Sequence, residues 1–311
     1  MSGEKTRLLV IGAGVNGSVC AAGLYNAGFD VTVMARGQRL GELRNAGIEI
    51  EDPIGNTRTA TKVPVICKLE NDDLYDYIFV IVRKNQVNEL LPVLAQNRSP
   101  SIVFMVNTAL GPEEWVAVLG RQRVLLGFAF AGGRREGSLI RAIRPKRAVA
   151  PFGEVDGAKS ERLKRLIEIL KAAGFRAKPS ATMPDWLATH AAMVAPLALL
   201  ILKHGCDTYA MARSREDLRT LVNALREAIQ VLRAVGRHVV PATTLLLVIL
   251  PRFAVTGLFR AMLSSRIGEI GAAWHCSQAP DEMMQLAREL KELVERSNLP
   301  APTLRQLLQT V

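Results

Sequence analysis

Three glycines near the start of the chain have the spacing that a nucleotide phosphate requires. The stretch Gly12-Ala13-Gly14-Val15-Asn16-Gly17 directly follows an apolar run of strand length, residues 7–11, and precedes a helix-compatible run, residues 18–26. The first glycine permits a tight turn, the second lets the main chain approach a pyrophosphate, and the third lets helix and strand pack closely. Free N–H groups at the helix start attract the negative charge. The pattern predicts a dinucleotide site, and the alternative is a turn that binds nothing.

The end of the next predicted strand, residues 30–34, indicates which dinucleotide is favoured. Enzymes that use NAD(H) usually carry Asp or Glu about 20 residues beyond the glycines, where the carboxylate binds the ribose hydroxyls. Here Arg36 follows the strand, and Asp30 lies at the opposite end. A guanidinium can instead bind a 2′-phosphate. The sequence therefore favours NADP(H), unless Arg36 is an ordinary solvated side chain.

Alternating strands and helices in the first half of the chain must position these residues. Apolar runs of strand length occur at 77–82, 102–106 and 124–130, with helical patterns at 86–94 and 113–119 between them. This alternation predicts an α/β fold with an N-terminal Rossmann domain, a doubly wound parallel sheet. Residues 47–50 and 57–63 flank a turn-rich segment and predict a β-hairpin insertion.

Helical spacing replaces the strand pattern after Pro184, which predicts an all-helical C-terminal domain. We place the boundary near residue 180, giving domains 1–180 and 181–311. Two apolar windows, 186–202 and 239–250, are shorter than the ~20 residues of a membrane span. We interpret both as buried helices and expect no membrane partner.

Composition limits the class of protein further. Hydrophobic residues make up 49% of the 311 positions and charged residues 22%, a globular balance. The four cysteines are far apart, so we expect neither a metal cluster nor a disulfide framework. The acid at Glu4 and the short apolar run that follows argue against a signal peptide, which favours a cytoplasmic location.

The net charge of +11 raises the question of a nucleic-acid partner. The densest basic stretch, residues 134–147, contains no aromatic side chain on which a base could stack. We interpret it as a solvated basic face and expect no nucleic acid.

Three further stretches resemble the ketopantoate reductase family. They are Arg83-Lys84-Asn85-Gln86 after the third parallel strand, Asn107 at the end of the next strand, and the glycine-rich and basic stretch 127–137. The resemblance implies a Rossmann domain followed by a helical domain, with NADP(H) as cofactor. It also implies that Arg83, Asn107 and Gly133 lie at the cofactor.

The chain departs from this family where the family carries a catalytic Lys and two Asn on one helix before a Pro. Counting back from Pro196, the Asn positions become Ala195 and Ala191, and the Lys position becomes Leu187 or Ala188. A family Ser that helps to hold substrate aligns with Ala261. An apolar face in place of these polar groups predicts a substrate other than ketopantoate.

Two other side chains are candidates for the chemistry. His190 projects near the face of the missing Lys and can act as an acid near neutrality, although it also fits a core histidine. By the resemblance, the family's late Glu becomes Glu282, with Glu269 as the competing position. Glu282 also fits an acid that stabilises a helix N-terminus.

We therefore expect an NADPH-dependent reductase that moves hydride to a carbonyl or imine carbon of a small, rather apolar substrate. A non-catalytic NADP(H)-binding sensor or interaction protein is the alternative, because it would explain the missing Lys and Asn side chains. Homodimer formation is a further expectation.

Overall fold

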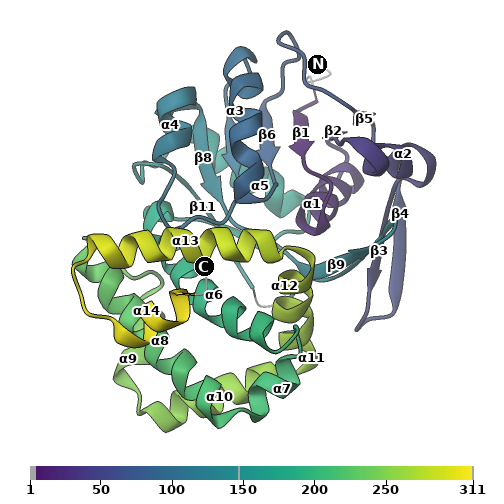
Figure 1. Cartoon of the computed structure of the whole chain (residues 1–311). Coiled ribbons are helices and arrows are strands. Elements are labelled where there is room, and N and C mark those ends of the chain that lie inside the picture. The colour runs from purple at the N-terminus through teal and green to yellow at the C-terminus, as the bar shows by residue number, and fades with distance from the viewer. Residues whose placement is uncertain (1–4, 146–147, 310–311) are drawn as a thin grey trace. The chain divides into compact units, whose positions relative to one another are not determined.

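The computed structural model describes residues 5–145 and 148–309, and its contacts divide the chain into two units (Figure 1). The first unit comprises Met1–Val106 and Pro112–Met183, and the second comprises Asn107–Gly111 and Pro184–Val311. The short segment Asn107–Gly111 thus packs with the second unit, although it lies within the range 1–180 that the sequence places in one domain. Glu4 of the signal-peptide argument, and Lys146 and Arg147 of the basic stretch, lie outside the described residues.

Eight strands form the main sheet of the first unit, in the order β12-β11-β8-β7-β6-β1-β2-β5. The six strands from β8 to β5 run parallel, and β11 pairs antiparallel with β8. The strands are β1 (Arg7–Ile11), β2 (Asp30–Met34), β5 (Val65–Ile66), β6 (Tyr77–Val80), β7 (Ile102–Phe104), β8 (Val124–Gly127), β11 (Ala150–Glu154) and β12 (Ala177–Pro179). The parallel sheet confirms the predicted α/β class.

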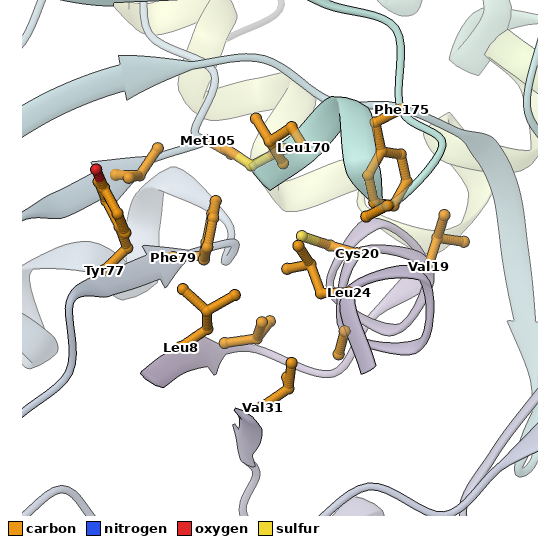
Figure 2. Close-up of a cluster of buried hydrophobic side chains, with 14 of the residues drawn as sticks. Leu8, Val19, Cys20, Leu24, Val31, Tyr77, Phe79, Met105, Leu170 and Phe175 are labelled. Carbon is orange, nitrogen blue, oxygen red and sulfur yellow. The ribbon is translucent and has the colours of Figure 1, made fainter. Parts of the chain in front are cut away.

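Helices follow the strands of this sheet, because parallel strands need crossover connections. They are α1 (Val15–Asn26), α2 (Gly37–Ala46), α3 (Val87–Gln96), α4 (Glu113–Leu119) and α5 (Glu161–Ala172). Figure 2 shows the core at α1, where Cys20 and Leu24 lie near Leu8 of β1 and Phe79 of β6. Burial raises the pKa of the Cys20 thiol, so this cysteine acts as an apolar core residue.

A second, four-stranded sheet has the order β4-β3-β10-β9. Its strands are β3 (Ile48–Asp52), β4 (Thr57–Thr61), β9 (Gly132–Glu136) and β10 (Leu139–Ile143). The antiparallel pairing of β3 with β4 confirms the predicted hairpin. Three arginines of the basic stretch form ion pairs: Arg134 pairs with Glu136, Arg135 lies 3.4 Å from Glu42, and Arg141 lies 2.6 Å from Glu51. This stretch is therefore partly neutralised by carboxylates rather than only solvated.

The regular secondary structure of the second unit is helical throughout its described residues. Its helices are α6 (Met183–Lys203), α7 (Thr208–Arg213), α8 (Arg215–Ala234), α9 (Leu246–Ile249), α10 (Arg252–Leu263), α11 (Arg266–Gly268), α12 (Trp274–Gln278), α13 (Pro280–Arg296) and α14 (Pro302–Leu308), with a π-helical turn at Glu269–Ala273. Leu221 and Leu225 of α8 and Leu286 and Leu290 of α13 belong to one buried cluster with α6. The largely helical second half confirms the predicted order of fold types.

Helix α6 is longer than the apolar window seen in the sequence. Its 21 residues are long and apolar enough to cross a membrane by length and composition, the one such helix among the described residues. The expectation that this segment is too short for a span was therefore wrong. In the second unit 61% of its most apolar window is buried, and Ala191, Ala195 and Leu199 lie in the core cluster. The burial supports the interpretation of α6 as a core helix.

The contact between Gly17 and the end of β1 leads to a stability prediction. A Cβ at Gly17 would lie 1.8 Å from the carbonyl oxygen of Gly12, so main-chain atoms would have to move. We expect Gly17→Ala to lower the free energy of unfolding by at least about 2 kcal/mol, as overpacking of a core does. Gly41→Ala in α2 is the matched control, because a Cβ there meets nothing within 4 Å. The control should be stabilised by about 0.5–1 kcal/mol, and urea unfolding that shows equal effects would contradict the prediction.

Candidate cofactor and substrate sites

The glycine turn of the first unit leaves main-chain amides and open space at the start of α1. It lies where the strand order reverses between β1 and β6, the usual position of a nucleotide in such sheets. Gly12 has φ of +101°, and a Cβ on it would lie 2.2 Å from the Ile81 carbonyl oxygen. Gly14 precedes α1 without a side-chain cap, and a Cβ on it would meet nothing within 4 Å. The turn therefore fits a pyrophosphate group.

Side-chain hydrogen bonds hold this turn in place. The Asn16 Oδ1 atom accepts from the main-chain nitrogens of Phe130 (3.1 Å) and Ala131 (2.9 Å). The Arg39 side chain donates to the Ala13 carbonyl oxygen (3.1 Å) and to Ser18 Oγ (3.2 Å). Desolvation lowers the pKa of Arg39, although the nearby Glu42 carboxylate opposes this effect. The Asn16 side chain thus ties the turn to residues 130 and 131. Arg39 also stabilises the turn, a role that the sequence analysis did not predict.

Arg36 lies at the carboxyl end of β2, directly before α2. Its Nη1 atom is 3.7 Å from Glu89 Oε2, and both side chains are mostly exposed. A weak, solvated ion pair of this kind costs little to exchange for another anion. The guanidinium therefore follows the end of β2 and is available to bind a 2′-phosphate.

Arg83 and Gly133, both predicted at the cofactor, have local structural roles as well. Arg83 begins a short 3-10 turn, and its main-chain nitrogen donates to Gln86 Oε1 (3.2 Å). A Cβ at Gly133 would lie 2.2 Å from the Arg141 carbonyl oxygen on the neighbouring strand. The close pairing of β9 with β10 explains this glycine without a ligand. Contact of Arg83 or Gly133 with a cofactor stays a prediction.

A buried carboxylate in the second unit holds the segment Asn107–Gly111. Glu289 Oε2 accepts from Thr108 Oγ1 (3.0 Å) and from the main-chain nitrogens of Ala109 (2.7 Å) and Leu110 (3.2 Å). Arg237 donates to the Leu110 carbonyl oxygen (2.8 Å). Charge-assisted bonds to main-chain N–H groups are strong, so the segment has a defined position on α13.

This position places Asn107 against Glu282, two helical turns before Glu289. Asn107 Nδ2 donates to Glu282 Oε1 (3.0 Å), and His275 Nε2 lies 3.5 Å from Glu282 Oε2. Glu282 is buried, whereas the His275 side chain is 40% exposed. The buried Asn107 Oδ1 atom has no hydrogen-bond partner among the described residues. Because a buried unpaired oxygen is costly, this atom is a candidate acceptor for a ligand group.

The geometry favours Glu282 over Glu269 as the late acid. Glu269 accepts from Arg266 (2.7 Å) and from the Tyr209 hydroxyl (3.2 Å). Glu269 is therefore bound by these two side chains, whereas Glu282 is the acid that contacts Asn107. Glu282 also lies in the first turn of α13, as the helix-terminus interpretation requires, so the two interpretations are compatible.

His190 lies on α6, where its ring stacks on Trp186 with 5.2 Å between centroids. Burial, and secondarily the neighbouring His275, lower the pKa of His190 to about 4. An imidazole with this pKa is neutral at pH 7 and is a poor proton donor, which disfavours its predicted role. The aligned positions Leu187, Ala191 and Ala195 are all buried apolar side chains.

Sequence reasoning missed Glu289, Arg39 and the pairing of His275 with Glu282. Glu289 carries a sequence signal, because a spacing of seven places it on the helix face of Glu282. Arg39 carries no such signal, because its partners at the turn, Ala13 and Ser18, are 26 and 21 positions away. His275 carries none because it lies on α12, a different helix from Glu282. Among the described residues, no group of three or more His, Cys, Asp or Glu side chains could hold a metal ion.

Comparison with known proteins finds a family similarity in the first part of the chain. Residues 8–149 match the family model described as Ketopantoate reductase PanE/ApbA. A 2-dehydropantoate 2-reductase of Archaeoglobus fulgidus is 27% identical over 172 residues, which cover 55% of this chain and 55% of that protein. The chain thus matches about half the length of this curated relative.

Solved structures share the fold over nearly the whole chain. A D-mandelate dehydrogenase with NADH and anilino(oxo)acetate superposes with a TM-score of 0.79 at 13% identity, covering 97% of this chain and 96% of that one. The 2-dehydropantoate 2-reductase of Methylococcus capsulatus gives 0.75 at 19% identity, covering 98% and 95%. That of Geobacter metallireducens GS-15 gives 0.78 at 16% identity, covering 97% and 98%. At these identities the likeness establishes a common fold.

The lowered pKa of His190 predicts an acid-dependent loss of stability. The folded state resists protonation down to a pKa of about 4, whereas an unfolded imidazole titrates near ~6.5. The stabilisation from neutral His190 is therefore complete above the unfolded value and is lost as the pH falls toward the folded one. When the pH falls from ~7 to ~4.5, the free energy of unfolding should decrease in both proteins. We expect the decrease in His190→Gln to be smaller than that of the native chain by about 1–3 kcal/mol.

Denaturant unfolding at the two pH values measures this difference. His238→Gln, at an exposed histidine, is the control and should lose as much stability as the native chain. Equal losses in all three proteins would show that burial does not hold His190 neutral.

Proposed function

We propose that the chain is an NADPH-dependent reductase that transfers hydride to the carbonyl or imine carbon of a small apolar substrate, with 2-oxo acids other than ketopantoate as the first class to test. The observation that carries the proposal is the glycine turn, where Gly14 leaves open space beside uncapped amides. The family match of residues 8–149 and the likeness to a D-mandelate dehydrogenase that binds NADH and an oxo acid support it.

The main-chain amides of residues 12–17 would hold the pyrophosphate, and Arg36 would bind a 2′-phosphate. Asn107, with its unpaired Oδ1 atom, would accept a hydrogen bond from the nicotinamide ribose or from substrate. Arg83 would contribute positive charge to the cofactor. When bound, the reduced nicotinamide supplies the hydride, and the remaining chemistry is the delivery of a proton.

We assign that proton to His275. Hydride addition to a carbonyl carbon forms a C–H bond and moves the π electron pair of the C=O bond onto oxygen. This oxygen must then be protonated to give the alcohol. Leu187, Ala191 and Ala195 cannot donate a proton, and His190 is neutral at pH 7. His275 has a ring nitrogen 3.5 Å from the buried Glu282 carboxylate, which orients the imidazole. Its partial exposure lets solvent return the proton after each cycle.

A non-catalytic NADP(H)-binding sensor is the second candidate. The buried apolar side chains at Leu187, Ala191 and Ala195 favour it, because a face without polar groups needs no role in turnover. The two candidates agree on cofactor binding and differ on oxidation of the cofactor.

Incubation with NADPH or NADH and a panel of 2-oxo acids, ketones and imines tests the proposed reductase. We expect oxidation of NADPH with branched or aromatic 2-oxo acids and little with ketopantoate. Arg36→Ser should lower kcat/KM for NADPH by about 10- to 100-fold, the value of one charge-assisted contact, and leave that for NADH nearly unchanged. NADPH binding without oxidation across the panel would favour the sensor. Equal use of both cofactors by the native chain would remove the role of Arg36.

A second experiment tests the proton donor. We expect His275→Gln to lower kcat by about 10²–10⁴-fold, as loss of a general acid does. The affinity of the variant for NADPH should be unchanged. His238→Gln is the matched control. An unchanged kcat in His275→Gln would exclude this role even if the chain is a reductase.

A further inference from the structure

A hollow of about 560 Å³ lies in the second unit where α8 and α10 pack together. Pockets for small ligands usually measure ~300–1,000 Å³. The lining residues on α8 are Arg215, Arg219, Val222 and Asn223, and those on α10 are Arg252, Phe253, Thr256, Gly257 and Arg260. Each set follows the spacing of one helix face.

The charged side chains that line this hollow are all positive. Its lining contains four guanidinium groups and no carboxylate. None of these four arginines has a side-chain hydrogen bond or an ion pair within residues 5–145 and 148–309. All four are exposed at the rim of the hollow, whereas the less exposed Arg39 and Arg141 are paired with Glu42 (3.0 Å) and Glu51 (2.6 Å). Because like charges repel, four unpaired arginines around one hollow favour the binding of an anion.

Gly257 keeps the hollow open. It lies in the middle of α10, and a Cβ on it would meet nothing within 4 Å. Its φ is not in the left-handed region, so neither the main chain nor packing requires glycine. A glycine in a helix interior costs about 1 kcal/mol relative to Ala. The lack of a side chain here has the local effect of leaving space between the arginines.

We propose that this hollow binds a small molecule that carries a diphosphate or triphosphate group. Guanidinium groups bind phosphate oxygens with two parallel hydrogen bonds each. Four guanidinium groups match the several negative charges of a diphosphate or triphosphate better than the single charge of a carboxylate ligand. Asn223 and Thr256 add neutral donors, and the Phe253 ring, 80% exposed, offers an apolar surface to the rest of the ligand. The site is separate from the glycine turn, which belongs to the first unit, and does not depend on the proposed reductase activity.

Calorimetric titration of the full chain with sodium tripolyphosphate, and separately with ATP, tests the site. We expect saturable binding that weakens as salt rises. The double variant Arg219→Gln/Arg260→Gln should weaken it at least tenfold, since each lost charge-assisted contact is worth about tenfold or more. Gly257→Leu fills the hollow without a change of charge and should weaken binding comparably.

Arg233→Gln is the matched control, because this exposed arginine also lies on α8 but not in the hollow. It should keep the native affinity within about twofold. Since tripolyphosphate can also bind at the glycine turn, the variants decide the location. The proposal is overturned by the absence of saturable binding, by an equal loss in Arg233→Gln, or by full binding in Gly257→Leu with native circular dichroism. Binding of anionic vesicles or duplex DNA without tripolyphosphate binding would also overturn it.

Discussion

The close approach of Gly17 to Gly12 is the constraint on which the first unit depends. No side chain fits between the end of β1 and the first turn of α1, since a Cβ would lie 1.8 Å from a carbonyl oxygen. This contact sets where the helix begins and therefore where its unpaired amides point. The buried Arg39 and the Asn16 side chain then fix the same turn from outside it. The candidate anion site is thus a product of main-chain geometry, which needs few specific side chains.

Two carboxylates of α13 organise the candidate site of the second unit. Glu289 binds the main chain of residues 108–110, and Glu282, two turns earlier, binds the Asn107 side chain and lies beside His275. One helix therefore positions both the amide and the imidazole. In the proposed reductase, the proton would come from an imidazole that the buried Glu282 carboxylate orients.

The sequence predicted the fold class well, because periodicity and glycine spacing are local signals. Strands β1, β2 and β6, the β3–β4 hairpin and the helical second half all follow from residues close together in the chain. The site was only partly predictable, because its pairs are distant: Asn107 meets Glu282 across 175 positions. His190 was a reasonable candidate by helix spacing, but its pKa depends on burial and on His275, which no pattern within α6 reveals. The length of α6 was underestimated because Met183 and Lys203 lie outside the uncharged window.

The placement of residues 107–111 has a consequence for dissecting the molecule. The polypeptide leaves the sheet after β7, contributes five residues to the helical unit and returns to the sheet through α4. A fragment that starts at Pro184 would therefore lack the donors that satisfy Glu289 and would leave that buried carboxylate uncompensated. The helical unit is consequently not a self-contained folding unit. A chimera that exchanges it between relatives must also exchange residues 107–111 together with α13.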